Sequence, residues 1–387
     1  MNALELFVGA GGLALGVSTA GVSHLGVVER DKYCCDTIRE NQARKTPMVS
    51  DWPLIQSDVT LLDFSSYEGR VDLVTGGPPC QPFSIGGKHR AYLDSRDMFP
   101  QAVRCVRETR PKAFIFENVR GLVRPAFFNY FNYICLQLEY PPVVRKLSDN
   151  WQDHHRRLQQ LKTSGIGAEL SYNIVRKVLN AADYGVPQRR ERVFIVGFRS
   201  DLGVEWSFPD PTHTEDGLLY EQFISGDYWE QHKVAKRARR KITPPIRSKL
   251  RKIDPTVRMI PWGRWQTVRD ALAGLPDPQL RGVPVPNHRF QDGAKSYPGH
   301  TGSPIDEPGK TLKAGDHGVP GGENTVRFPD GSVRYFTVRE AARLQTFPDN
   351  FVFHGSWTET MRQLGNAVPV ALGRSVAESV AASLTVW

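Results

Sequence analysis

One cysteine lies in a stretch whose composition would hold its thiol in a fixed position. Cys80 is part of the sequence Gly-Gly-Pro-Pro-Cys-Gln-Pro-Phe-Ser at residues 76–84, in which three prolines restrict the backbone and two glycines let a ligand approach closely. A thiol held beside a ligand is a candidate nucleophile. The other four cysteines lack such a frame, and we expect them to be buried and inert: Cys34, Cys35, Cys105 and Cys135.

A carboxylate and two guanidinium groups could act with this thiol. Glu117 follows the apolar run 113–116, and a carboxyl group at a strand end either binds a substrate or, where burial raises its pKa, donates a proton. Residues 188–192 read Gln-Arg-Arg-Glu-Arg and precede another apolar run. Because alternate residues of a strand share a face, we expect Arg190 and Arg192 to point together, where they would favour a thiolate.

The first thirty residues predict a cofactor site. An apolar run at residues 3–7 is followed by glycines at 9, 11 and 12, a helix at 13–20, a second apolar run at 22–28 and Glu29. The glycines allow close approach at the helix N-terminus, and the acid can accept hydrogen bonds from ribose hydroxyls. The glycine spacing departs from GxGxxG, so NAD, FAD and S-adenosylmethionine each fit, and a purely structural turn is the alternative.

These elements indicate an α/β fold. Further apolar runs at 71–75, 113–116, 172–175 and 193–198 predict parallel strands separated by helices, in a sheet covered on both faces. Ligands of such sheets bind at the carboxyl ends of the strands, which is where Cys80 and Glu117 would lie.

Length and composition limit the class of protein. The 387 residues suffice for two domains, and no apolar run approaches the roughly 18 residues that cross a bilayer, so we expect a soluble, cytoplasmic protein with no membrane partner. With five cysteines and no CxxC pair, we expect neither disulfides nor a metal site. We interpret His154 and His155 as part of a solvated helix face.

The net charge of +9 comes from one segment of the chain. Residues 231–253 contain ten Lys or Arg and no acid, whereas the rest of the chain has 40 basic and 41 acidic residues. A polyanion is the natural partner of such a segment. A solvated loop is the alternative, and Pro244, Pro245 and Pro255 argue against one long helix there.

In this order the motifs resemble those of the cytosine-C5 DNA methyltransferases, of the bacterial modification type. The matching blocks are residues 6–12, 29–31, 58–60, 76–84, 94–99, 117–122, 188–192, 339–349 and 363–370. One departure is Ala367, where the family often has Ser or Thr, which costs one possible hydrogen bond to the cofactor. No catalytic group is missing, so we expect an active enzyme.

The resemblance implies a Rossmann-like methyltransferase domain, with a twisted, mostly parallel sheet and helices on both faces, plus a smaller, irregular target-recognition domain. The cofactor would be S-adenosylmethionine, with Glu29 on its ribose and Asp58 on its adenine amino group, and S-adenosylhomocysteine would be a product. The cofactor set implied by the resemblance is Phe7, Gly9, Ala10, Gly11, Gly12, Glu29, Arg30, Asp58, Val59, Pro79, Met98, Asn366, Ala367 and Val368.

The resemblance also implies catalytic roles. Cys80 would attack C6 of a cytosine, Glu117 would engage N3 and the 4-amino group, and Arg192 would hold O2. Addition of the thiolate makes the ring an enamine, so that C5 can accept a methyl group. A base inside a duplex cannot reach Cys80, so the target would be flipped out of double-stranded DNA.

By the same resemblance, residues 1–198 and 357–387 form a discontinuous catalytic domain and residues 199–356 the target-recognition domain, in a chain expected to be monomeric. The residues expected at DNA are Ser84, Gln188, Lys233, Arg237, Arg239, Arg240 and Lys241.

Three alternative functions compete with DNA methylation: methylation of RNA by the tRNA-type branch of the family, a NAD-dependent dehydrogenase, and a DNA-binding protein with a relic site. The dehydrogenase would leave the Cys80 loop unexplained.

Overall fold

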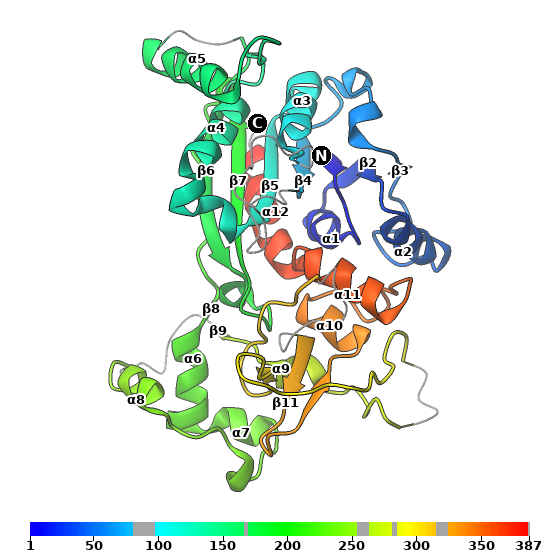
Figure 1. Cartoon of the computed structure of the whole chain (residues 1–387), viewed down its shortest axis with the longest axis vertical. Coiled ribbons are helices and arrows are strands. Elements are labelled where there is room, and N and C mark those ends of the chain that lie inside the picture. The colour runs from blue at the N-terminus through cyan, green and yellow to red at the C-terminus, as the bar shows by residue number, and fades with distance from the viewer. Residues whose placement is uncertain (80–96, 166–168, 254–262, 281–284, 315–323, 386–387) are drawn as a thin grey trace.

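The computed structural model describes residues 1–79, 97–165, 169–253, 263–280, 285–314 and 324–385. Two residues expected at the site, Cys80 and Ser84, lie outside the described residues. Within these ranges the chain forms a large lobe built on one sheet, the sheet lobe, and a second lobe of short elements (Figure 1).

A seven-stranded sheet in the order β3-β2-β1-β4-β5-β7-β6 organises the sheet lobe. Its strands are β1 (Asn2–Leu6), β2 (Ser23–Glu29), β3 (Leu54–Gln56), β4 (Leu73–Gly76), β5 (Ala113–Val119), β6 (Tyr172–Asn180) and β7 (Glu191–Arg199). The first five strands pair in parallel, which confirms the predicted α/β class and the mostly parallel sheet.

The prediction that residues 193–198 form a parallel strand was wrong. Strand β7 pairs antiparallel with both β5 and β6. Only a short connection containing the 3-10 turn Ala181–Tyr184 separates β6 from β7. A parallel strand needs a crossover of a dozen or more residues, so the chain must return antiparallel here.

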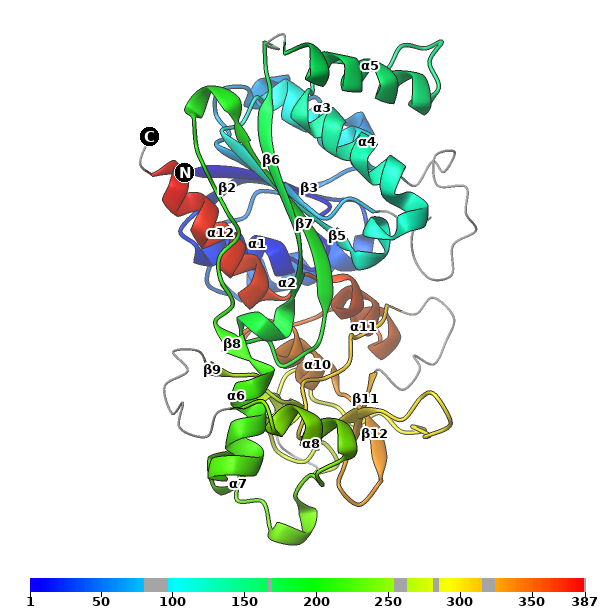
Figure 2. The same ribbon diagram turned by 90° about the vertical axis from the view of Figure 1, so that its left-hand side faces the viewer.

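Helices cover both faces of the sheet, as predicted (Figure 2). On one face α3 (Phe99–Thr109) and α4 (Phe128–Glu139) pack on alternate strand residues such as Phe114 and Phe116. On the other face α1 (Gly12–Thr19) and α12 (Val370–Leu384) pack on Ile115 and its same-face neighbours. Two further helices, α2 (Lys32–Ala43) and α5 (Trp151–Ser164), lie beside β3 and α4.

The last helix returns to the first. After α11 (Trp357–Asn366) the chain passes Pro369, and α12 then packs closely against α1. A Cβ on Gly16 would lie 2.5 Å from the backbone nitrogen of Arg374, so only glycine permits this approach. The N-terminal and C-terminal parts of the chain therefore form one lobe.

The second lobe consists of short, irregular elements, as the resemblance implies. They are β8 (His213–Thr214), α6 (Glu215–Tyr220), α7 (Asp227–Gln231), α8 (Pro244–Leu250), β9 (Gly263–Arg264), α9 (Val268–Leu272), β10 (Ser303–Pro304), β11 (Thr325–Arg327), β12 (Val333–Tyr335) and α10 (Val338–Leu344). The short α8 agrees with the expectation that no long helix spans the basic segment.

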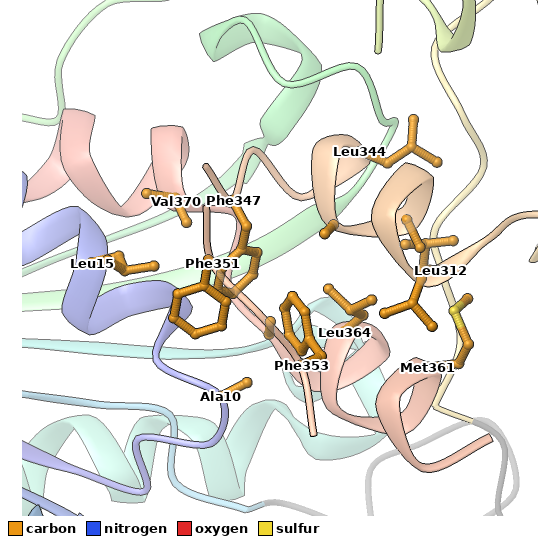
Figure 3. Packing of buried hydrophobic residues seen from close by; sticks show 14 of the residues in the cluster. Ala10, Leu15, Leu312, Leu344, Phe347, Phe351, Phe353, Met361, Leu364 and Val370 are labelled. Carbon is orange, nitrogen blue, oxygen red and sulfur yellow. The ribbon is translucent and has the colours of Figure 1, made fainter. Parts of the chain in front are cut away.

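One hydrophobic cluster joins the two lobes. Ala10 and Leu15 of the sheet lobe gather with Phe347, Phe351 and Phe353, which follow α10 (Figure 3). The cluster also contains Met361 and Leu364 of α11, so it includes residues on both sides of position 356, where the sequence-based domain boundary was set. Packing across this position fixes the two lobes relative to each other.

Histidines of α5 differ from expectation. His154 is buried, not part of a solvated face, and its ring nitrogens contact Tyr133 Oη at 2.9 Å and the Val143 carbonyl oxygen at 2.7 Å. The reason is that α5 packs on the aromatic side of α4, so these two partners satisfy the imidazole.

No helix among the described residues is both long enough and apolar enough to cross a membrane.

The four cysteines expected to be inert are all buried. Burial raises the pKa of the Cys35 thiol to about 12 and raises those of the other three. These thiols are therefore protonated near neutral pH and are poor nucleophiles.

Candidate active site

The turn after β1 brings the glycines and Glu29 together at the carboxyl edge of the sheet. The Glu29 carboxylate accepts hydrogen bonds from the backbone N–H groups of Gly9, Arg30 and Asp31, each at 2.8 Å. Phe7 adopts a left-handed conformation (φ 57°) that reverses the chain before Gly9. This edge is where a sheet of this type holds a nucleotide.

Gly11 and Gly12 serve close packing. A Cβ on Gly12 would lie 2.2 Å from the carbonyl oxygen of Val368, and one on Gly11 would lie 2.7 Å from the Trp52 ring. The segment 366–368 is thereby held against the glycine turn, with Asn366 exposed and the next two residues buried. Residues far apart in sequence thus form one surface, as the resemblance implies for a cofactor pocket.

Asp58 lies beside Arg30 at the same edge. The Arg30 Nη1 atom is 3.1 Å from Asp58 Oδ2, and the backbone N–H of Thr60 donates to the other oxygen at 2.9 Å. The hydrogen bonds from Thr60 lower the pKa of Asp58, so it is a carboxylate acceptor near neutral pH. Val59 is buried, and Met98 packs partly buried against the same core.

Glu117 and Arg192 meet across strands β5 and β7. The Arg192 Nε atom lies 2.8 Å from Glu117 Oε1, and the two side chains are 11% and 8% exposed. Oε1 nevertheless has no aligned hydrogen-bond donor among the described residues. Burial raises the pKa of Glu117, and the nearby positive charge of Arg192 only partly opposes this. The carboxyl group is thus poised to exchange a proton or a hydrogen bond with a ligand.

The backbone leading to Cys80 is tied to this pair. Asn118 Nδ2 donates to the Pro78 carbonyl oxygen at 2.8 Å, and the Met98 backbone N–H donates to that of Pro79 at 3.3 Å. A Cβ on Gly77 would lie 3.4 Å from Glu117 Oε2. The chain therefore enters the cysteine loop next to the buried carboxyl group.

The expectation that Arg190 faces the thiol together with Arg192 needs correction. Arg190 is fully buried, and its guanidinium donates to the carbonyl oxygens of Leu312, Gly365 and Ala367 at 3.2, 2.7 and 2.9 Å. Arg190 precedes the first residue of β7, so strand alternation does not fix its direction. It connects the second lobe with the end of α11 and does not act directly on a substrate.

Gln188 is also misassigned as a DNA contact. Its side chain is fully buried, accepts from the Leu312 backbone N–H at 3.0 Å and donates to the Leu344 carbonyl oxygen at 3.2 Å. Both polar atoms are used inside the protein, so none is available to a base. The sequence alone does not show whether an amide beside several arginines contacts DNA or forms hydrogen bonds inside the protein.

The basic segment divides into satisfied and free side chains. Arg240 pairs with Glu307 at 2.8 Å, and Arg239 donates to the Val234 carbonyl oxygen at 3.2 Å. Arg237 and Lys241, like Lys233, are exposed. Lys236, Arg247, Arg251 and Lys252 are exposed as well. Among the described residues, these exposed side chains are available to a polyanion without losing an internal contact.

Asn118 is a functional candidate that the sequence reasoning did not single out. Its side-chain bond to Pro78 joins the Glu117 strand to the cysteine loop, and its oxygen accepts from the Val119 N–H at 2.8 Å. Its position could have indicated this role, because an amide directly after a candidate acid at the end of a buried strand needs hydrogen-bond partners.

Comparison with known proteins fits this geometry. A model of the C-5 cytosine-specific DNA methylase family matches residues 1–140 and 148–382. The chain therefore belongs to this family of S-adenosylmethionine-dependent DNA (cytosine-5-)-methyltransferases, which confirms the resemblance seen in its motifs.

Individual relatives extend over nearly the whole chain. Type II methyltransferase M.Eco47II of Escherichia coli is 32% identical over 381 residues, covering 97% of this chain and 78% of that protein. Type II methyltransferase M.NgoMIV of Neisseria gonorrhoeae is 30% identical over 386 residues, covering 99% and 98%. A prophage-encoded protein of Escherichia coli, solved as a candidate DNA modification methyltransferase, has the same fold (TM-score 0.56, 23% identity, covering 100% and 99%).

Proposed function

We propose that the chain binds S-adenosylmethionine at the glycine turn and methylates a cytosine in double-stranded DNA. Two features support the cofactor site. Gly9 has open space where a side chain would be, and Gly11, the N-cap residue of α1, provides no side-chain cap, so the N-terminal N–H groups of α1 can receive a carboxylate. Glu29 would bind the ribose hydroxyls and Asp58 the adenine amino group. When bound, the cofactor supplies an electrophilic methyl group.

The protein would activate the cytosine with three side chains. Cys80 would add to C6, Glu117 would donate to N3, and Arg192 would hold O2. The observation that carries this proposal is the buried Glu117–Arg192 pair, because its carboxyl group has a raised pKa beside the entry to the Cys80 loop. Protonation at N3 makes C6 more electrophilic and C5 more nucleophilic once the thiolate has added.

The biological setting is the finer part of the proposal. Two full-length relatives are named type II methyltransferases, so we propose that this chain modifies a specific DNA sequence within a restriction-modification system. It would act as a monomer in the cytoplasm and flip its target base from the duplex. Ser84 and the exposed residues of the basic segment would contact the DNA.

A covalent adduct tests the chemistry directly. Duplex DNA with 5-fluorocytosine at the target should give a complex with the wild type that survives denaturing electrophoresis, because fluorine is not lost as a proton is. Cys80→Ser should give none, whereas Cys135→Ser, which changes a buried thiol on α4, should behave as the wild type. An adduct with Cys80→Ser would contradict the assignment.

Bisulfite sequencing identifies the substrate. Plasmid DNA from cells that express the protein should show one methylated cytosine in a constant sequence context. Methylation found only in the RNA of these cells would instead support the tRNA-type alternative.

A further inference from the structure

A cationic cavity adjoins the proposed catalytic pair. It has a volume of about 630 Å³ and is lined by Arg120, Arg124, Val178 and Glu191 together with Gly121, Val123 and Pro125. None of the roles proposed above uses these residues. The lining combines two guanidinium groups with one carboxylate, so the cavity carries a net positive charge.

Strand register places this cavity at the same edge of the sheet as the Glu117–Arg192 pair. Val119 at the end of β5 pairs with Arg192 on β7, and Arg120 is the next residue after Val119. Glu191 directly precedes Arg192. The cavity therefore lies at the carboxyl edge of the sheet, beside the ends of β5 and β7. Because strand residues alternate, Glu191 and Val178 are on the face that packs on α3 and α4, whereas Glu117 and Arg192 are on the other face.

The charges in the cavity are only partly neutralised. Arg120 forms an ion pair with Glu191, in which the side chains are 63% and 44% exposed. Arg124 is exposed, and its guanidinium has no ion-pair or hydrogen-bond partner in the part of the chain that the structure describes. An exposed ion pair of this kind is weak and is readily exchanged for another anion.

We propose that this cavity binds a phosphate of the DNA strand that carries the flipped cytosine, and that Glu191 occupies Arg120 until the phosphate replaces it. The inference rests on the proposed function and names a backbone subsite for it. A base held by Glu117 and Arg192 brings its own strand to this edge of the sheet, around which the cavity opens. A phosphate there matches the forked donors of arginine, and its binding helps offset the cost of unstacking the target base.

Salt dependence of binding tests the two arginines. Each phosphate contact contributes about −0.9 to the slope of log K against log[salt]. Arg120→Gln and Arg124→Gln should each make the slope less negative by about 0.9, and they should weaken cognate and non-cognate duplexes equally, because phosphate contacts carry no sequence information. The matched control is Arg156→Gln on α5, where an arginine that is 68% exposed pairs with Asp153. An unchanged slope in both variants would overturn the proposal, as would a loss confined to cognate DNA.

Glu191 provides a test with the opposite sign. Glu191→Gln should tighten DNA binding by about 1.4- to 5-fold, which is the range expected when an exposed ion pair no longer competes for Arg120. In an Arg120→Gln background the same change should have no effect. Weaker binding by Glu191→Gln, or equal effects in both backgrounds, would contradict the exchange of carboxylate for phosphate.

The two levels of proposal fail separately. If the wild type forms no 5-fluorocytosine adduct, the proposed methyl transfer is wrong. If the wild type forms the adduct but the arginine variants keep the wild-type slope, only the phosphate subsite is wrong.

Discussion

Two buried arginine–carboxylate pairs, one in each lobe, differ in how completely they are satisfied. In the second lobe Asp270 receives two hydrogen bonds from Arg264 at 2.8 Å, two from Thr267 at 2.7 and 2.8 Å, and contacts the His232 ring at 2.9 Å. In the sheet lobe, Arg192 Nε is the one partner of Glu117 within the part of the chain that the structure describes. Exposure does not explain the difference, since all four arginine and carboxylate side chains are at most 11% exposed.

The two carboxyl groups have opposite pKa shifts. Burial raises the pKa of Asp270, but the hydrogen bonds and charge of Arg264 outweigh it, so the net pKa is lowered. For Glu117 burial dominates, and the pKa is raised. A fully satisfied pair stabilises a fold, whereas a carboxyl group short of donors retains binding capacity for a ligand.

The largest expected effect follows from removing the acid at the under-satisfied pair. Glu117→Gln should reduce methyl transfer by about 10²- to 10⁴-fold, the usual contribution of a positioned acid or base. The fold should persist at reduced stability, because the amide keeps the size of the side chain and its oxygen can still accept from Arg192, but Arg192 loses its carboxylate partner. Transfer of tritiated methyl groups, together with thermal unfolding, measures both quantities. A rate near that of the wild type would remove Glu117 from the chemistry.

The same substitution at the satisfied pair should act on stability instead. Asp270→Asn leaves Arg264 buried with one remaining carboxylate partner, Glu221, at 2.7 Å. Loss of one partner from a buried pair costs about 3–5 kcal/mol, and we expect a value near about 3 kcal/mol because Glu221 remains. Urea unfolding followed by tryptophan fluorescence gives this free energy. A stable Asp270→Asn variant with impaired catalysis would reverse the comparison.

The pH dependence of stability should separate the pairs by sign. The lowered pKa of Asp270 means that its contribution is complete above about pH 4, near its unfolded pKa, and is lost as the pH falls further. The raised pKa of Glu117 means that the unfolded chain ionises first, so the free energy of unfolding falls as the pH rises above about 4.5.

Matched variants isolate these two contributions. The difference in unfolding free energy between the wild type and Asp270→Asn should shrink below about pH 4. Above about pH 4.5, the free energy of unfolding of the wild type should fall relative to that of Glu117→Gln. If the two differences in unfolding free energy changed with pH in the same direction, the two carboxyl groups would titrate alike.

The sheet lobe was predictable because its signals are local. Apolar runs located β1, β2, β4 and β5, although β4 begins two residues later and β5 ends three residues later than its run, and Glu117 could be assigned from its place near a strand end. The direction of β7 was not predictable from its apolar run, because direction depends on the length of the preceding connection. The three-residue strand β3 was missed, since three residues show no periodicity.

The direction of polar side chains was harder to predict than their identity. Arg190 and Gln188 lie in the motif that supplies Arg192, yet both turn into the junction between the lobes. Their partners are backbone carbonyl and N–H groups more than 100 residues away, which no local pattern reveals. The second lobe depends on such contacts throughout, as the Arg269–Asp306 pair at 2.6 Å illustrates, and its elements were correspondingly not predicted.

The smallest expected effect extends the comparison to the basic segment. Arg237→Gln combined with Lys241→Gln should make the slope of log K against log[salt] less negative by up to about 1.8, because two exposed cations would no longer neutralise phosphates. Arg240→Gln alone should leave the slope nearly unchanged, since Glu307 already neutralises that guanidinium. Filter binding over a range of salt concentrations, on cognate and random duplexes, measures the slopes. If all three substitutions leave the slope unchanged, these three side chains lie away from DNA and belong to a solvated part of the segment. A larger effect of Arg240→Gln would mean that an ion pair within the protein does not keep an arginine from binding a phosphate. The contrast between fully paired and incompletely paired groups, drawn from the two buried pairs, would then not hold on this surface.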